Sequence, residues 1–308
     1  MAQRKATSLE LKVDKFVLPE INPAFQKTVS YSQFSTYLTC PNKWYLQYVK
    51  RLHKAFNINM TFGTAVHATL QEYITNVYEV SGAHADRMNL EELFQTNFSE
   101  AYQADFKKAG HHFTTPQEMG EFFEDGMNIL NYIRKNRSKL FTIRRRLLMG
   151  IEMPILYKVD NNLYLKGFLD VVFYDVDLEK VYIWDFKTSK SSWKDDKKKD
   201  EVKQYQLLLY KKYFSLQYDF PIENIEVKFM VLKRKIWEQS EYAQPRTQDV
   251  IPPSGTGKIN KCLTTFQSFI NDCFENGKYI EKQYHKEIGE ASCKWCPFAG
   301  NLCNQVNA

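Results

Sequence analysis

The sequence lacks any long run of apolar residues. No stretch approaches the roughly 20 consecutive apolar residues that a membrane-spanning helix needs. The N-terminal residues MAQRKATSLELKVDK also lack the apolar core of a secretion signal. With 25% charged residues and a mean hydropathy of -0.50, the composition excludes an integral membrane protein. We therefore expect a soluble protein of the cytoplasm, with no membrane partner.

A phosphate-binding loop of the Walker A type is missing as well. The segment SGTGK at 254–258 lacks the leading glycine four positions earlier, and no strand directly precedes it. Internal repeats are also absent. The sequence therefore predicts no nucleotide-driven motor within this chain.

The apolar content is high enough for a packed core. Hydrophobic residues make up 44% and aromatic residues 15% of the 308 residues, which excludes a disordered chain. This length allows one large domain or two small ones. Lys and Arg number 42 against 36 Asp and Glu, so the net charge is +6 and the isoelectric point about 8.8. That charge suits an anionic partner such as DNA or RNA without demanding one.

The apolar pattern changes near residue 143. Residues 1–30 favour an extended arm because Pro19 and Pro23 interrupt them. Residues 31–140 have helical periodicity, with an apolar stripe of Val66, Leu70, Tyr73 and Val77. Beyond residue 143, three β-branched and aromatic runs separated by VDNN and VDLE predict a three-stranded meander. The helices expected elsewhere cover 31–52 with a break at Pro41, 63–80, 89–108, 116–140, 200–217 and 258–284, and a further strand covers 225–235.

Asp170 and Asp185 lie on the second and third of these strands. Partners across an antiparallel hairpin have a constant sum of residue numbers, and the polar turn 175–180 sets that sum at about 355. The two aspartates fit this sum, so we expect them opposite each other, with Cβ atoms about 5 Å apart. Alternation along VYIWDFK then places Lys187 on the same face.

Facing carboxylates in an apolar sheet repel and raise each other's proton affinity unless a cation neutralises them. A divalent metal ion with oxygen ligands is the usual cation. Lys187 alone could serve instead, and an Asp/Asp/Lys trio is also a common structural ion pair. These residues alone leave the three interpretations open.

The cysteines suggest a second site. Cys293, Cys296 and Cys303 form C-x-x-C followed by six residues and a third cysteine, which in a reducing compartment indicates metal ligation. A tetrahedral site needs a fourth thiolate, for which Cys40 is the candidate. Four thiolates suit zinc or an iron-sulfur cluster equally. Closing a loop of about 250 residues in this way would stabilise the fold. Cys262 and Cys273 are expected to pack within the last long helix.

Five motifs, carried by six segments, resemble the PD-(D/E)XK nucleases, specifically the RecB-like exonuclease branch that includes AddB nuclease domains and CRISPR adaptation nucleases. GFLD at 167–170 with DFKT at 185–188 resembles the D-x-D/E-x-K core. YSQFSTYLTCPNKWYLQYVKRL resembles the N-terminal cysteine motif of that branch, and FGTAVHATLQEY resembles its histidine helix. QLLLY resembles its Q-x-x-x-Y helix, and CKWCPFAGNLC resembles its C-terminal cysteine triplet. They span residues 31–303. Leu169 replaces the familiar proline, and the second acid is Asp185 rather than glutamate.

The resemblance implies a mixed central sheet flanked by helices, with a restriction-endonuclease-like core and a [4Fe-4S] cluster on the four cysteines that joins the two chain ends. It also implies one or two Mg²⁺ or Mn²⁺ ions held by His67, Asp170, Asp185 and the backbone carbonyl of Phe186. Lys187 would orient or activate the attacking water. Such groups supply the activated water and the charge neutralisation that phosphodiester hydrolysis needs. A histidine on a helix is, by itself, also commonly structural.

Three further polar residues are candidates for supporting roles. Gln206 and Tyr210 project from one helical face, where they could contact a phosphate, buttress the catalytic lysine or simply pack. Glu152 could supply an outer-shell carboxylate or be an exposed strand-end acid. Trp44, Tyr45, Tyr48 and Trp193 could stack on unpaired bases, although aromatic residues at helical spacing are commonly core.

We expect a single nuclease domain over residues 1–308. Its parts are N-terminal cysteine-bearing helices at 31–62, a helical region at 63–142 that covers the active-site cleft, a catalytic α/β core at 143–240 and a C-terminal helix with the cysteine cluster at 241–308.

The expected function is a metal-dependent deoxyribonuclease. Similarity favours an exonuclease on single-stranded DNA ends, 5′ to 3′, in recombination, repair or phage DNA metabolism, with a helicase or recombination protein as partner. The alternative is a non-catalytic DNA-binding scaffold subunit. The complete set of His67, Asp170, Asp185 and Lys187 argues against it, because binding alone needs no facing carboxylates that repel phosphate. RNA as substrate and endonuclease action stay open.

Overall fold

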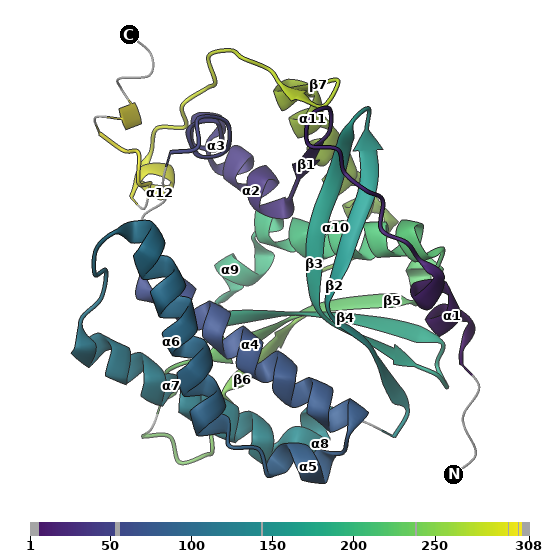
Figure 1. Ribbon diagram of the computed structural model, residues 1–308, viewed down its shortest axis with the longest axis vertical. Coiled ribbons are helices and arrows are strands. Elements are labelled where there is room, and N and C mark those ends of the chain that lie inside the picture. The colour runs from purple at the N-terminus through teal and green to yellow at the C-terminus, as the bar shows by residue number, and fades with distance from the viewer. Residues whose placement is uncertain are drawn as a thin grey trace.

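A mixed six-stranded sheet lies at the centre of the computed structural model, which describes residues 6–52, 56–142, 144–237, 239–294, 296–300 and 302–303 (Figure 1). The strand order is β1-β3-β4-β5-β6, and β2 pairs with β3 off this path. β1 with β3 and β4 with β5 are parallel pairs, whereas the other pairs are antiparallel. The predicted meander is thus confirmed. The strands are β1 (Lys27–Val29), β2 (Arg146–Asp160), β3 (Leu163–Asp175), β4 (Lys180–Ser189), β5 (Ile225–Lys233) and β6 (Thr247–Val250).

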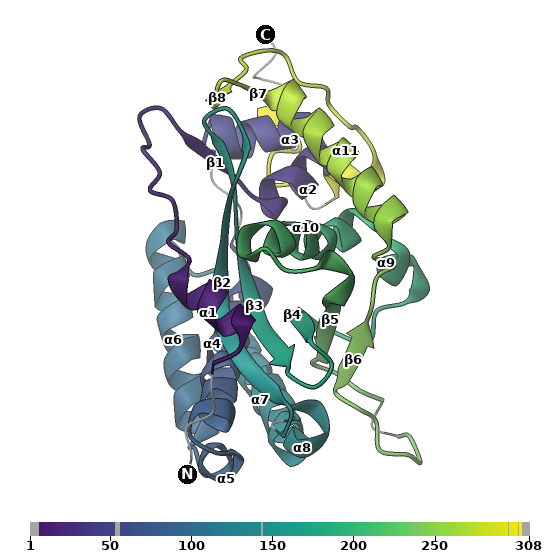
Figure 2. The ribbon, with the colours of Figure 1, turned by 90° about the vertical axis from the view of Figure 1, so that its right-hand side faces the viewer.

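Helices cover both faces of the sheet, so the chain builds two apolar cores (Figures 1 and 2). One core packs α2, α10 and α11 against the face that carries Val181 and Ile183. The other packs α4, α6 and α7 against Trp184 and Phe186. The alternation predicted along β4 is therefore confirmed. These helices are α2 (Tyr31–Thr39), α4 (Ile58–Glu79), α6 (Leu90–Ala109), α7 (Pro116–Lys135), α10 (Glu201–Tyr218) and α11 (Thr256–Cys273).

Local sequence signals explain where the helices nearest the site begin. Side chains of Ser30, Asn57 and Asp200 cap α2, α4 and α10 by accepting hydrogen bonds from backbone N–H groups of the first turn. The predicted apolar stripe of α4 is fully buried. In the described part of the chain, no helix is long and apolar enough to cross a membrane.

Two predictions about the chain ends were wrong. Residues 6–30 are not an extended arm, because Thr7 and Glu10 form a capping box that starts α1 (Ser8–Lys15), and β1 follows. The last long helix ends at Cys273 rather than residue 284. There the chain forms a hairpin of β7 (Phe274–Glu275) and β8 (Lys278–Tyr279) across Asn276 and Gly277, both left-handed.

The short elements complete the chain. The predicted break at Pro41 is confirmed, since α2 is followed by α3 and a π-helical turn. Asn136 divides the helix expected at 116–140 into α7 and α8, and the lysine-rich run at 194–200 forms a short helix, α9. These elements are α3 (Pro41–Trp44), η1 (Tyr45–Val49), α5 (Gly82–Asp86), α8 (Arg137–Leu140), α9 (Asp195–Lys199), η2 (Ile222–Asn224) and α12 (Glu290–Cys293).

Candidate active site

The β3–β4 hairpin has the predicted register. Its pairs run from Asp175 opposite Lys180 to Val171 opposite Trp184, and the next position along the same register places Asp170 opposite Asp185. At that position, Oδ2 of Asp170 accepts a hydrogen bond from the backbone N–H of Phe186 at 2.7 Å. The two carboxylates therefore lie where the β3–β4 ladder ends, although β3 continues to pair with β2 and β4 with β5.

Asp185 is held by a lysine and an amide. It is 2% exposed, and its Oδ1 accepts a hydrogen bond from Nε2 of Gln206 at 2.7 Å. The ammonium of Lys187 forms an ion pair with Oδ2 at 2.7 Å, and this buried oxygen has no other partner among the described residues. Burial raises the pKa of Asp185, and the charge of Lys187 opposes that rise. Oδ2 is thus a buried acceptor that a further cation could use.

Asp170 and His67 meet beside this pair. Nδ1 of His67, on α4, lies 3.6 Å from Oδ2 of Asp170, and the imidazole packs edge-on against the ring of Phe186. Burial and then the charge of Lys187 lower the pKa of His67 to about 4, so the ring is neutral at pH 7. Burial and the charge of Asp185 raise the pKa of Asp170 well above its ordinary value. A neutral imidazole with paired carboxylates is a suitable donor set for a divalent metal ion.

The predicted helical pair also faces this site. Gln206 and Tyr210 lie on α10, and Nε2 of Gln206 bridges Asp185 and the Tyr210 hydroxyl, the latter at 3.3 Å. Gly167 makes room for the phenol, because a Cβ there would lie 2.9 Å from the Tyr210 ring. The glycine of the GFLD segment therefore lets β3 approach α10 closely.

Glu152 stands opposite Asp170 on the neighbouring strand. The ladder pairs Ile151 with Val171 and Met153 with Leu169, and between them Glu152 has a φ of 47°. This left-handed conformation is costly for a residue other than glycine and commonly marks a functional position. The carboxylate accepts a hydrogen bond from Nε2 of Gln71 at 2.5 Å.

A pocket of about 380 Å³, called the acidic pocket below, opens over these groups. Besides Glu152, Asp170 and Tyr210, it contains residues that the sequence patterns did not single out. Gln71, which contacts the same site through Glu152, was also missed, although it follows His67 by four positions and so shares its helix face. The acidic pocket is lined by Thr28, Ser30, Tyr31, Ser32, Gln33, Glu152, Lys166, Gly167, Phe168, Asp170 and Tyr210.

The four-cysteine site is not assembled in this structure. Nδ2 of Asn42 donates a hydrogen bond to Sγ of Cys303 at 3.5 Å, which brings the C-terminal segment beside α3 and the end of α2, where Cys40 lies. Cys293, however, approaches the backbone carbonyl of Glu287 at 3.9 Å. Among the described residues, no group of three or more His, Cys, Asp or Glu side chains converges on one point suited to a metal ion.

This also holds for His67, Asp170 and Asp185, whose carboxylates contact the Phe186 N–H, the Gln206 amide and the Lys187 ammonium. Trp295 and Asn301, inside the cysteine triplet segment, lie outside the described residues. Cys262 and Cys273 are buried in α11 as predicted.

A mixed sheet that carries two acids and a lysine at the end of one hairpin, with helices on both faces, defines a restriction-endonuclease-like core. A family model for the PD-(D/E)XK nuclease superfamily matches residues 28–304, nearly the whole chain, and the chain belongs to this superfamily. The superfamily implies a nuclease. A search of curated proteins finds no match.

Proposed function

We propose that this chain is a Mg²⁺- or Mn²⁺-dependent DNA exonuclease of the RecB-like branch. In this proposal it removes nucleotides from single-stranded DNA ends, 5′ to 3′, during recombination, repair or phage DNA metabolism. The observation that carries the proposal is the meeting of Asp170, Asp185, Lys187 and His67 at the end of the β3–β4 ladder. A helicase or recombination protein would supply the unpaired strand.

Each residue of the cluster has a chemical role in this proposal. His67, Asp170, Asp185 and the carbonyl of Phe186 hold one or two divalent ions, which supply charge neutralisation at the phosphate and a more acidic water. Lys187, whose side chain is one third exposed, orients the attacking water and offsets charge that develops on the phosphate. Gln206 and Tyr210 keep Asp185 in place, because the amide occupies Oδ1 and leaves Oδ2 for a cation. Glu152, next to Asp170, adds an outer carboxylate.

The surroundings of the acidic pocket favour an unpaired strand. Phe168, two residues before Asp170, leaves 44% of its surface exposed at the pocket wall, and the Lys166 ammonium lies 5.6 Å from its ring centroid. An exposed ring beside a cation can stack on a base while the cation contacts the backbone. A base in a duplex presents no free face to such a ring.

The first test is cleavage of linear single-stranded DNA labelled at either end, with protein purified anaerobically. We expect degradation with Mg²⁺ or Mn²⁺, none with EDTA, and earlier loss of the 5′ label. Release of the 3′ label first would reverse the proposed polarity. Tight binding without cleavage under any metal would favour the scaffold subunit.

We further infer that Cys40, Cys293, Cys296 and Cys303 hold a [4Fe-4S] cluster, with zinc as the alternative. Support comes from the cysteine spacing and from the Asn42–Cys303 hydrogen bond, which brings the two chain ends together. Thiolates bind both metals well, so the donor set is compatible with either. Such a centre stabilises the fold and takes no part in hydrolysis.

Replacing Cys293 by alanine should remove bound iron, or zinc, and lower the thermal unfolding midpoint, because one of four ligands is lost. Metal analysis and thermal unfolding of anaerobically purified protein measure both effects. Cys262→Ala is the control, since Cys262 is buried in α11 and should keep the metal. Normal metal content and stability of Cys293→Ala would refute the metal centre.

A further inference from the structure

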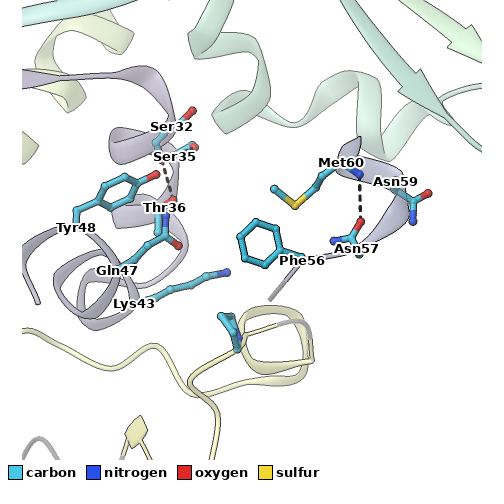
Figure 3. A pocket seen from close by; sticks show the side chains of 11 residues that line it. Ser32, Ser35, Thr36, Lys43, Gln47, Tyr48, Phe56, Asn57, Asn59 and Met60 are labelled. Atoms are coloured by element: carbon cyan, nitrogen blue, oxygen red, sulfur yellow. Dashed lines mark hydrogen bonds between the residues drawn. The ribbon is translucent and has the colours of Figure 1, made fainter. Parts of the chain in front are cut away.

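A second and larger pocket adjoins the acidic pocket. It has a volume of about 620 Å³, within the range of roughly 300–1,000 Å³ that is typical of ligand sites. Ser32 on α2 lines both pockets, so the two spaces are neighbours across one residue. We call this the flanking pocket; it is lined by Ser32, Ser35, Thr36, Lys43, Gln47, Tyr48, Phe56, Asn57, Asn59, Met60 and Pro297 (Figure 3).

The charge of the flanking pocket is opposite to that of its neighbour. Lys43 on α3 is the one charged side chain among its lining residues, and none of them is acidic. No ion pair to Lys43 is present among the described residues, so its ammonium is available to an anion. The acidic pocket, by contrast, contains two carboxylates, Glu152 and Asp170, against one lysine, Lys166. A polynucleotide that runs across both pockets would meet a phosphate-attracting lysine beside the site of cleavage.

Aromatic rings stand next to this lysine. Figure 3 shows the ring of Phe56 and the amino end of Lys43 pointing into the same space from opposite walls. Behind Phe56, the ring of Phe113 packs at 6.0 Å between centroids and supports it. Tyr48 is half-buried on the α3 side. Three of the four aromatic candidates from the sequence, Trp44, Tyr45 and Trp193, are instead buried in the core, which leaves Tyr48 as the one that lines a pocket.

Small polar groups complete the wall. Gln47 of η1 offers an amide, whereas the Ser35 and Thr36 hydroxyls of α2 donate to the backbone carbonyl of Ser32 and offer only their oxygens as acceptors. Asn57 offers its side-chain NH₂, because its Oδ1 is used to cap α4 by accepting the Met60 N–H at 3.2 Å. Neutral donors of this kind commonly contact phosphate and sugar oxygens without reading sequence.

We propose that the flanking pocket binds the unpaired nucleotides next to the scissile phosphate, with Lys43 on a backbone phosphate and Phe56 stacked on a base. The proposal rests on the proposed nuclease function and adds a binding subsite to it. The strand must be single, because Phe56 can stack only on a base whose face is free. Since the contacts are backbone and stacking contacts, binding is tolerant of sequence.

The test uses oligothymidylates of about 4 and about 16 nucleotides, spanning the usual site sizes of single-strand binders. Binding is measured by fluorescence anisotropy in EDTA, and cleavage kinetics with Mg²⁺. Lys43→Ala and Phe56→Leu should each raise Kd and KM for the longer strand about tenfold, with kcat unchanged. The shorter strand, too short to fill both pockets, should be affected little. Lys43→Arg and Phe56→Trp should retain tight binding.

Two exposed residues provide controls for charge and ring loss. Lys139 is exposed on α8, at the opposite end of the molecule from α3 (Figure 1). Tyr242 is exposed in the loop before β6. Alanine variants of both residues should bind as the wild type does. Unchanged Kd and KM in Lys43→Ala and Phe56→Leu, with an active wild type, would overturn the subsite and leave the nuclease proposal standing. Equal weakening for a blunt duplex would overturn the single-strand assignment.

Failure of the nuclease proposal is distinguishable from failure of the subsite. If the wild type binds the longer strand without cutting it, a loss of binding in the two variants still supports the subsite. If the wild type neither binds nor cuts single strands, the subsite is refuted together with the function.

Discussion

Replacing Lys187 by alanine should reduce the rate of DNA cleavage by at least about 10²-fold, and Asp185→Asn should do the same. The ammonium of Lys187 is the one partner of Oδ2 of Asp185, a buried oxygen, among the described residues. Asparagine keeps the shape of Asp185 but removes the negative charge that a metal ion requires. Cleavage of end-labelled single-stranded DNA under single-turnover conditions measures the effect.

The matched control is Lys180→Ala. Lys180 lies on the same strand and pairs with the exposed Glu226 at 2.6 Å, away from the acids. This variant should cleave at the wild-type rate, and all three proteins should retain the circular dichroism spectrum and cooperative unfolding of the wild type. Wild-type cleavage by Lys187→Ala would mean that this lysine has only a structural role in the ion pair.

Replacing Trp44 by alanine should lower the free energy of unfolding by about 3–5 kcal/mol. Trp44 is fully buried, and its indole N–H donates to Oε1 of Gln33 at 3.4 Å. Its ring packs edge-on against Phe269 of α11, Phe274 of β7 and Tyr284. Truncation therefore leaves a large cavity where α3, α11 and the C-terminal hairpin meet. Urea unfolding of the purified variant measures the loss.

Trp237→Ala is the control for this prediction. Trp237 leaves 68% of its surface exposed, and surface substitutions cost about 0.5 kcal/mol or less. Trp44→Phe should fall between the two, because it retains most of the ring contacts and loses the hydrogen bond. A loss below about 1 kcal/mol for Trp44→Ala would show that the neighbouring rings collapse into the space.

Much of the candidate site could be predicted because its determinants are local. The centre of the turn between β3 and β4 sets the register, and the alternation of apolar residues sets the two faces of β4. Together they predicted Asp170 beside Asp185 with Lys187 on the same face. The four-residue spacing of Gln206 and Tyr210 likewise predicted a shared helix face, which is the one that contacts Asp185.

The missed features have equally physical explanations. Pro19 and Pro23 favoured an extended arm, but they lie after α1, whose start is set by the capping box of Thr7 and Glu10. The apolar pattern at 258–284 predicted one continuous helix, but the left-handed turn of Asn276 and Gly277 lies within it and forms a hairpin. The thiol groups were predicted to meet from their spacing, but spacing sets neither the path of the C-terminal segment nor the direction of its side chains.

The sequence alone determined the α/β class, the meander, the register of its second hairpin and the placement of the two acids and the lysine on one face. These features depend on the two-residue period of a strand and on the position of a turn, which are set within a few residues. The family resemblance, and no local pattern, predicted that His67 of α4 lies beside Asp170. Tertiary structure alone decided that Gln71 meets a left-handed Glu152 81 positions away and that Ser32 lines both the acidic and the flanking pocket. Such meetings depend on how two cores pack on opposite faces of one sheet, and no local pattern encodes that packing.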